Sequence, residues 1–500
     1  MTAVLTHSGG IRLREVLPEC QVTTGDDLKA TSCCSDPHAC QAGDLFVALC
    51  GEDADGHDFV YEAIDRGATA VVAERMLPVA VPVVLVEDTR DAYGRICQAL
   101  VDDPTQTMTT IGIAGSHGKT TVAKLLASVL RAAGERVGVI NSLENCDGFV
   151  CYEGEVPSSP PEMAHAMAEM QAAGCTHAIV EIDSRDLAKR RSAGLQLDGA
   201  ILTNVRHDKS HLQNTAGAQR VVSSRIFDQL KPTGFAVINA DDHGSQKILN
   251  RLDCPTITAA IHAEAEISAT LVERFASEQT VLLTAGDEMI PLRTKMIGDH
   301  HLSNCLLVAA AALALGIDLP TVVRGLEAVE NVPFRMERIE CGQPFSMFVD
   351  SADSPDRLAA CLRAARQVAA GRVICVANAD GAMPNEHRPL IGRILEKGTD
   401  IGLTTTSGFS PAPPLQAIHD VIDGYHRPAK AHAMPDRDQA IAWALSQAQP
   451  GDCVLIAGCT GQPSQRADGS SIDDAEFALQ IVLADQQEAA EPKILRMLGD

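Results

Sequence analysis

The chain has no apolar run long enough to cross a bilayer and far fewer basic than acidic residues. Its longest apolar stretch, residues 306–317, is shorter than the roughly 20 residues of a spanning helix and predicts a buried, Ala-rich helix instead. Forty-one Lys and Arg against 66 Asp and Glu give a formal net charge of −25. That charge argues against a nucleic-acid partner or an anionic membrane, although a local basic pocket for phosphates remains compatible with it.

No pair of cysteines shows the Cys-x-x-Cys spacing of a metal or redox site, and no secretory leader is recognisable. The 16 cysteines are scattered along 500 residues, so we expect reduced thiols in a cytoplasmic protein rather than a disulfide framework or a zinc site. The composition, 45% hydrophobic and 21% charged, is that of an ordinary globular protein. A chain of this length exceeds one ordinary hydrophobic core and predicts two or three domains.

Short apolar runs alternate with helix-length segments along the whole chain, which predicts an α/β fold of three domains. We place these domains at residues 1–107, 108–331 and 332–500. The second is expected to be a mostly parallel P-loop sheet with helices on both faces, and the third a Rossmann-like sheet. The strands are predicted at residues 45–49, 70–73, 81–85, 177–182, 199–205, 235–239, 345–350, 373–377, 401–405 and 453–457.

Residues 111–121 read Ile-Gly-Ile-Ala-Gly-Ser-His-Gly-Lys-Thr-Thr, an apolar run that ends in a Gly-rich turn before a helix. Two glycines let the backbone N–H groups approach phosphates, the lysine supplies charge, and the first threonine hydroxyl can ligate Mg²⁺. Apolar residues at helical spacing as far as residue 131 support the helix. The loop is shorter than the usual Walker spacing. The predicted phosphate-binding residues are Gly115, Ser116, His117, Gly118, Lys119, Thr120 and Thr121.

Further motifs follow in a fixed order, and together with the P-loop they resemble the Mur ligase family essentially from end to end. They are Ala42-Gly-Asp-Leu-Phe-Val-Ala-Leu49, Asp55-Gly-His57, Glu181, Thr203-Asn204, Asn239-Ala-Asp-Asp242, His301-Leu-Ser-Asn304, Val332-Pro-Phe-Arg335, the Asp350 segment, and Ile472-Asp-Asp474. The first two look like the family's UDP-sugar-binding domain.

The resemblance implies an ADP-forming amide ligase that uses ATP and Mg²⁺ to add an amino acid to a UDP-linked muramoyl dipeptide, in peptidoglycan precursor synthesis. The peptide carboxylate would take the γ-phosphoryl group, and the amine would then displace phosphate from the acyl phosphate. Lys119 would stabilise the β- and γ-phosphates, and Thr120 and Glu181 would hold Mg²⁺. The resemblance further assigns Asn304 to the adenine, and Arg335 and Asp350 to phosphate and ribose.

Each of these residues also has a structural interpretation when it is taken alone. Glu181, at the end of a strand, fits a capping or salt-bridging acid. Asn304 fits a helix cap or first-turn residue. Arg335 fits a solvated surface charge.

The chain departs from the family pattern at the second metal site. Ser223 stands where the family has a lysine that carbamylation turns into a carboxylate, and Lys209 replaces a metal-binding histidine. We expect the Lys209 ammonium to replace part of the second cation's charge, and we count Lys209 with Lys119 and Glu181 as catalytic. The alternative is that this site has decayed.

The segments expected to bind the amino acid and the UDP-linked precursor also depart from the family pattern. Ser407 and Ser410 fall in the segment where the family's diaminopimelate-adding branch carries an arginine for the incoming carboxylate. Asp36 begins an Asp-Pro-His triplet in place of the Asp-Ser-Arg that helps to hold the uridine side. Ser158 and Ser159 retain hydroxyl groups where the family has Thr-Thr for the sugar-peptide substrate. We predict all five residues to bind substrate.

Three functions remain open. The first is the ligase, with an altered acceptor pocket and a reduced or altered activity. The second is a nucleotide-binding pseudoligase that regulates or scaffolds a working paralogue. The third, less supported by the first domain, is a related ligase acting on a folate or poly-amino-acid carboxylate. The expected partners are a UDP-linked muramoyl peptide and an amino acid, and a monomer is the working expectation.

Overall fold

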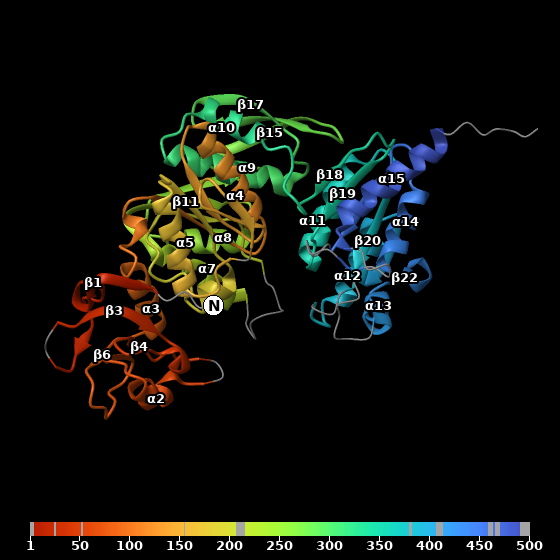
Figure 1. Cartoon of the computed structure of the whole chain (residues 1–500). Helices are drawn as coiled ribbons and strands as arrows, with labels where there is room; N and C mark the ends of the chain where they lie inside the picture. Colours follow the sequence, from red (N-terminus) through yellow and green to blue (C-terminus); the bar gives the residue numbers. More distant parts are fainter. Residues whose placement is uncertain are drawn as a thin grey trace, which may run out of the picture. The chain divides into compact units, whose positions relative to one another are not determined.

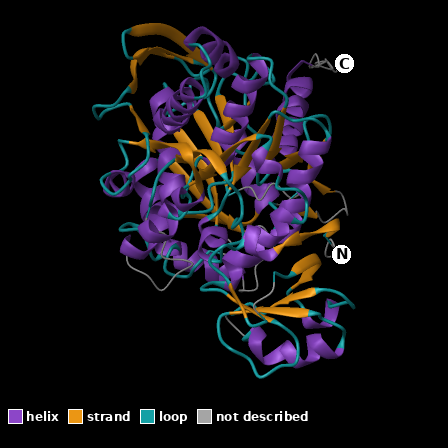
Figure 2. Ribbon diagram, turned by 90° about the vertical axis from the view of Figure 1, so that its left-hand side faces the viewer, coloured by secondary structure: helices purple, strands orange, loops and turns teal. Residues whose placement is uncertain are grey.

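The computed structural model describes residues 5–24, 27–51, 54–154, 156–206, 216–379, 383–406, 414–458, 464–465 and 471–490. In these residues three large β-sheets follow one another along the chain, at residues 6–85, 109–294 and 337–457, each with helices packed against it (Figures 1 and 2). The predicted three-domain α/β fold is therefore confirmed. Contacts between residues group the chain into two compact units. The first comprises Met1–Ala269, Leu283–Ile290 and Ser303–Leu326, and the second Thr270–Leu282, Pro291–Leu302 and Glu327–Asp500.

The N-terminal sheet is mostly parallel and has the strand order β1-β3-β4-β5-β6-β2, with both edge strands antiparallel to their neighbours. Side chains of β4 alternate between its two faces, because successive strand residues point in opposite directions. Leu45 and Val47 join the core beneath α3, whereas Phe46 joins the core beneath α2. The elements are β1 (Thr6–Arg12), α1 (Leu13–Val16), β2 (Gln21–Val22), β3 (Lys29–Cys34), β4 (Leu45–Val47), α2 (Val60–Asp65), β5 (Ala70–Ala73), β6 (Val83–Leu85) and α3 (Thr89–Ala99).

Helix α3 packs directly on the backbone of the loop at residues 189–196. A Cβ atom on Gly94 would overlap the carbonyl of Ala193, and one on Gly194 would lie 2.5 Å from the Gly94 carbonyl oxygen. Arg190 reinforces this contact with an ion pair to Asp88 at 2.7 Å. The N-terminal sheet and the P-loop sheet accordingly belong to the same compact unit.

The central sheet has the strand order β10-β9-β8-β11-β7-β12-β13-β14-β15-β16-β17, with β7 among parallel neighbours. Strands β7, β8, β11 and β12 are buried on both faces, which explains their continuous apolar sequences. The strands are β7 (Thr109–Ala114), β8 (Val137–Ile140), β9 (Glu144–Cys146), β10 (Cys151–Glu153), β11 (His177–Glu181), β12 (Leu197–Leu202), β13 (Leu230–Asn239), β14 (Thr256–Ala260), β15 (Ile267–Arg274), β16 (Gln279–Ala285) and β17 (Glu288–Thr294). The helices are α4 (Lys119–Ala132), α5 (Pro160–Ala172), α6 (Ser184–Ala188), α7 (Ala216–Ser224), α8 (His243–Leu249), α9 (Asp299–Ala314) and α10 (Leu319–Glu327).

The short hairpin of β9 and β10 carries a disulfide bond between Cys146 and Cys151. These residues face each other across the antiparallel pair, which brings their Cβ atoms within bonding reach. The expectation of reduced thiols alone is therefore wrong at this hairpin. The other cysteines in the described ranges are free.

The C-terminal sheet has the strand order β18-β19-β23-β20-β21-β22 and is parallel except for β18. Separate hydrophobic cores cover its two faces, as expected for a Rossmann-like sheet. Its strands are β18 (Glu337–Ile339), β19 (Ser346–Asp350), β20 (Val373–Asn378), β21 (Ile401–Thr406), β22 (His432–Asp436) and β23 (Cys453–Ala457). Its helices are α11 (Pro355–Val368), α12 (Arg388–Gly398), α13 (Pro414–Ile422), α14 (Arg437–Gln447) and α15 (Asp474–Ala490), and a small pair, β24 (Ser464–Gln465) and β25 (Ser471–Ile472), precedes α15.

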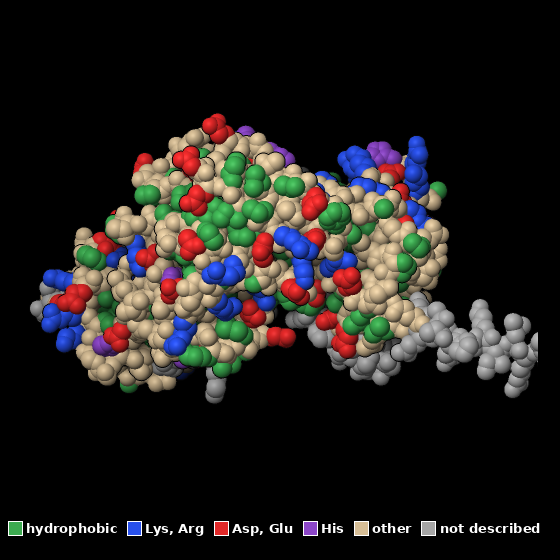
Figure 3. All heavy atoms as spheres, turned by 90° about the horizontal axis from the view of Figure 1, so that it is seen from above, with side chains coloured by type: hydrophobic (Ala, Val, Ile, Leu, Met, Phe, Trp, Pro, Cys, Tyr) green, Lys and Arg blue, Asp and Glu red, His purple; other side chains and the backbone are tan. Residues whose placement is uncertain are grey.

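Acidic and basic side chains are interspersed on the face of the molecule drawn in Figure 3. A search of the described helices finds none that combines the length and apolarity needed to cross a membrane.

Candidate active site

The P-loop joins the end of β7 to the start of α4 and depends on two glycines. Gly115 and Gly118 have φ of +139° and +89°, conformations that residues with side chains rarely adopt. A Cβ atom at Gly115 would overlap the Thr203 hydroxyl, and one at Gly118 would lie 2.6 Å from Asn304 Oδ1. The loop therefore presents bare backbone before the amino end of a helix, which is the geometry that binds phosphate.

The end of β12 holds the P-loop in place from behind. Asn204 accepts a hydrogen bond from His117 N at 3.2 Å and donates one to His117 O at 2.9 Å. Thr203 Oγ1 also donates to His117 O, at 2.7 Å, and Ser116 N donates to Asn204 O at 3.0 Å. The Thr-Asn motif, whose role was not predicted from the sequence, thus fixes the loop conformation.

Lys119 begins α4 and lies among oxygen atoms. Its Nζ donates to Gly115 O at 3.1 Å and lies 2.8 Å from Asp183 Oδ1 and 3.9 Å from Glu181 Oε1. The Lys119 charge holds the pKa of Asp183 below its usual range. Sequence reasoning missed Asp183, although its position two residues after Glu181 was an available signal.

Glu181 is the last residue of β11 and is 3% exposed. Its Oε2 accepts a hydrogen bond from Ser142 N at 3.2 Å, and the Ser142 hydroxyl lies 2.9 Å from Thr120 Oγ1. A hydroxyl and two carboxylates thus surround the start of α4. Hard oxygen donors of this kind, beside a cradle that excludes side chains, fit Mg²⁺ bound with a nucleotide.

Asn304, on helix α9, also lies beside the P-loop. Helix α9 begins at Asp299, so Asn304 lies in its second turn and the helix-cap interpretation is wrong. The side chain is buried, with its carboxamide oxygen against Gly118. Nearby, Asn239 Nδ2 donates to Thr203 O at 2.9 Å and to Ser303 Oγ at 3.1 Å, which ties β12 and β13 to α9. The adenine contact of Asn304 stays a prediction.

Arg335 and Asp350 lie in the second unit, where protein groups already contact them. Asp350 is 2% exposed, accepts a hydrogen bond from Met336 N at 2.7 Å and pairs with Arg357 Nε at 3.1 Å. Arg335 Nη1 donates to Phe334 O at 3.1 Å and to the Ser351 hydroxyl. Their contacts with phosphate and ribose stay predictions.

The predicted substrate-binding residues differ in whether other protein groups already hydrogen-bond to their side chains. Asp36 caps the 3₁₀ turn Pro37–Ala39 by accepting from His38 N at 2.9 Å. Ser158 donates through N and Oγ to Glu162 Oε2, at 2.8 and 3.0 Å, at the start of α5. By contrast, the Ser159 hydroxyl is buried with no hydrogen-bond partner among the described residues. The two neighbouring serines therefore differ, since the Ser158 hydroxyl has a protein partner and the Ser159 hydroxyl has none among the described residues.

Lys209, Ser407 and Ser410 lie outside the described residues. Ser223, near the end of α7, is 1% exposed, and its hydroxyl has no partner in the part of the chain that the structure describes. A buried hydroxyl without a hydrogen-bond partner costs stability.

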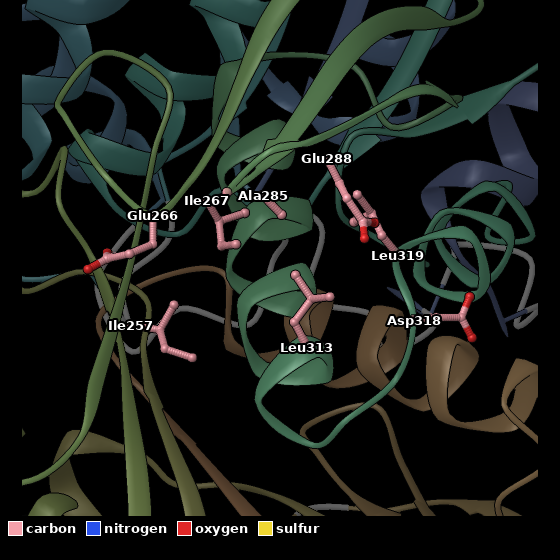
Figure 4. Close-up of a pocket in the computed structure, with 9 residues that line it drawn as sticks. Ile257, Glu266, Ile267, Ala285, Glu288, Leu313, Asp318 and Leu319 are labelled. Atoms are coloured by element: carbon pink, nitrogen blue, oxygen red, sulfur yellow. The ribbon is translucent and has the colours of Figure 1, made fainter.

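A separate cavity of about 450 Å³ lies between β14, β15, the β16–β17 turn and α9 (Figure 4). Its lining combines the apolar side chains Ile257, Ile267, Leu313 and Leu319 with the carboxylates Glu266, Glu288 and Asp318. Because its lining holds carboxylates and no Lys or Arg, the cavity is unsuited to phosphate. It is distinct from the P-loop site.

Comparison with known proteins shows the family to which the chain belongs. The chain matches three Mur ligase families: "Mur ligase family, catalytic domain" at residues 31–99, "Mur ligase middle domain" at 113–312, and "Mur ligase, glutamate ligase domain" at 334–460. It is 33% identical over 427 residues, 83% of this chain and 87% of the relative, to UDP-N-acetylmuramoyl-L-alanyl-D-glutamate–2,6-diaminopimelate ligase of Geobacillus kaustophilus. The chain belongs to the Mur ligase family. The resemblance found in the sequence is confirmed.

Other Mur ligases match over most of their length. The protein of the same name from Chlorobium phaeobacteroides is 32% identical over 485 residues, 92% of this chain and 93% of the relative. A solved structure of a ligase with that name has a TM-score of 0.68 at 21% identity, covering 96% of this chain and 99% of that one. The MurF ligase of Thermotoga maritima in complex with ADP has a TM-score of 0.61 at 18% identity, covering 92% and 98%. These two structures support the fold.

Proposed function

We propose that this protein is an ATP-dependent, ADP-forming amide ligase that adds an amino acid to UDP-N-acetylmuramoyl-dipeptide in the cytoplasm. The observation that carries the proposal is the placement of Lys119 at the start of α4, between the bare P-loop backbone and the carboxylates of Glu181 and Asp183. The names of the relatives supply the substrate class. They also make 2,6-diaminopimelate the first amino acid to test.

The proposed chemistry has two steps. The peptide carboxylate attacks the γ-phosphorus of ATP to give an acyl phosphate and ADP, and the amine then displaces phosphate through a tetrahedral intermediate. The P-loop backbone and Lys119 orient and neutralise the transferring phosphoryl group. Thr120 and Glu181 would hold Mg²⁺, which supplies further positive charge when bound.

The remaining roles extend this assignment. Asn304 is proposed to contact the adenine, Arg335 and Asp350 the phosphate and ribose, and Ser159 the precursor. The burial of the Ser159 hydroxyl without a described partner supports its role.

The test is to incubate the protein with ATP, Mg²⁺, UDP-N-acetylmuramoyl-dipeptide and a panel of amino acids that includes 2,6-diaminopimelate. We expect amine-dependent phosphate release and a product heavier by one amino-acid residue.

Lys119→Ala should lower the rate on the order of a hundredfold or more, because the developing phosphoryl charge loses its counter-ion. The matched control is Lys124→Ala, on the same helix, since Lys124 pairs with Glu144 at 3.3 Å instead.

The second candidate is a nucleotide-binding pseudoligase, which the unpartnered, buried Ser223 hydroxyl favours. Tight ATP binding with no turnover on any amino acid would support it. Amine-dependent phosphate release in the same assay would exclude it.

A further inference from the structure

Two carboxylates reach the P-loop lysine from the same strand end. Strand β11 ends at Glu181, and the chain stays extended through Asp183, which has φ −76° and ψ 154°. Because side chains alternate along extended backbone, residues 181 and 183 point to one side while Ile182, 1% exposed, points into the core. The strand thus delivers two acids to the edge of the sheet where α4 begins.

These two acids differ in their distance from Lys119 and in their exposure. Asp183 Oδ1 is 2.8 Å from Lys119 Nζ, whereas Glu181 Oε1 is 3.9 Å away. The Asp183 side chain is 53% exposed, whereas that of Glu181 is 4% exposed. Asp183 is therefore the carboxylate that a ligand arriving from solvent meets first.

This arrangement opposes a nucleotide that arrives without a cation. A triphosphate that approaches Lys119 must compete with Asp183 for the ammonium and meets a second carboxylate behind it. A divalent cation reverses the interaction, since Mg²⁺ prefers one or two carboxylates together with phosphate oxygens and water.

We propose that Asp183 joins Thr120 and Glu181 in holding the divalent cation of the nucleotide, and that it pairs with Lys119 until that cation arrives. Asp183 then makes ATP binding depend on Mg²⁺. The inference rests on the proposed function, because it requires that the P-loop bind ATP.

The test compares wild type with Asp183→Asn and with the matched control Glu144→Gln. The control also removes one carboxylate that pairs with a lysine of α4, but this lysine is Lys124, one helical turn beyond Thr120, and not the P-loop lysine. ATP affinity is measured by calorimetry with EDTA and with Mg²⁺. Mn²⁺ binding is measured by electron paramagnetic resonance in the presence of the β,γ-methylene analogue of ATP.

For Asp183→Asn we expect about tenfold tighter binding of metal-free ATP, since a competing charge is gone, and about tenfold weaker Mn²⁺ binding, since a ligand is gone. Asp183→Glu, which keeps the carboxylate, should recover part of the Mn²⁺ affinity, and Glu144→Gln should match wild type. A purely structural role of Asp183 would not move the two affinities in opposite directions.

Two results separate this inference from the proposed function. If wild type binds ATP and Asp183→Asn leaves Mn²⁺ affinity unchanged, the role of Asp183 is overturned and the ligase proposal stands. If wild type binds no ATP even with Mg²⁺, both are overturned.

Discussion

Gly118 shows how closely one residue of the P-loop is constrained. Its φ of +89° and the Asn304 oxygen 2.6 Å from its Cβ position together exclude a side chain. We predict that Gly118→Ala destabilises the protein by about 1–3 kcal/mol and weakens ATP binding at least about tenfold, because the loop must move to relieve the overlap. Denaturant unfolding and calorimetry measure the two effects.

Gly134 offers a matched control at the other end of the same helix. Its φ is +91°, but no atom lies within 4 Å of its Cβ position. Gly134→Ala should cost stability through backbone strain and leave ATP affinity at the wild-type value. Equal losses of ATP affinity in both variants would contradict the steric explanation.

Ser158 and Ser159 allow a second contrast at the residue scale. Ser158→Ala loses the hydrogen bond to Glu162 and should lower the free energy of unfolding by about 1 kcal/mol. Ser159→Ala loses no hydrogen bond to a described residue, so stability should hold or rise while the KM for the UDP-linked precursor increases about tenfold. Steady-state kinetics and thermal unfolding of both variants check this, and an unchanged KM in Ser159→Ala would refute its substrate role.

At the scale of elements, Asp242 connects a helix cap to the active site. Its Oδ2 accepts from Ser245 N, at the start of α8, at 2.8 Å and from Val205 N at 2.9 Å. Val205 follows Asn204, the residue that holds the P-loop. We predict that Asp242→Ala costs about 2–3 kcal/mol and also weakens ATP binding, because both donors lose their partner next to the loop.

Asp318 provides the comparison for Asp242. It caps α10 by accepting from Thr321 N at 2.9 Å and from Thr321 Oγ1 at 3.0 Å. Asp318→Ala should cost about 1 kcal/mol of stability and leave ATP binding unchanged. A loss of ATP affinity in this variant would mean that any lost cap, wherever it lies, disturbs the nucleotide site.

Elements that are determined by residues close together in the sequence could be predicted from it. Strands such as β7 and β20 are buried on both faces, so their apolar runs and the turns after them mark them plainly. The hairpin β9–β10 was not predicted, because its strands, Glu-Asn-Cys and Cys-Tyr-Glu, show no alternation of apolar and polar residues. The P-loop was predictable because its motif is contiguous. The contact of Asp183 with Lys119 was not, because it depends on β11 pairing beside β7.

At the scale of the whole molecule, two adjacent histidines make stability depend on pH. Burial lowers the pKa of His300 to about 4 and that of His301 well below its usual value. Between roughly pH 6.5 and pH 4 the unfolded chain therefore binds protons that the folded chain does not, so folding stability falls as pH decreases through that range.

We predict that the midpoint of thermal unfolding falls between pH 7 and pH 5, with each histidine contributing at most about 1.4 kcal/mol per pH unit. The variant His300→Asn should flatten this dependence. His432→Asn, which changes an exposed histidine of the same unit, serves as the control. If the unfolding midpoint of His300→Asn depended on pH as steeply as that of wild type, the role assigned to His300 would be contradicted.

The Cys146–Cys151 bond has a consequence for anyone who purifies this protein. Cys151 is exposed, so a reductant in the buffer reaches the disulfide bond. Samples kept with and without reductant then differ by two hydrogen atoms. The difference lies in a hairpin shortly before Ser158 and Ser159. Two preparations of identical sequence are then two chemical species at the segment assigned to the precursor. Kinetic values from different laboratories become comparable only when the thiol content of each batch has been counted.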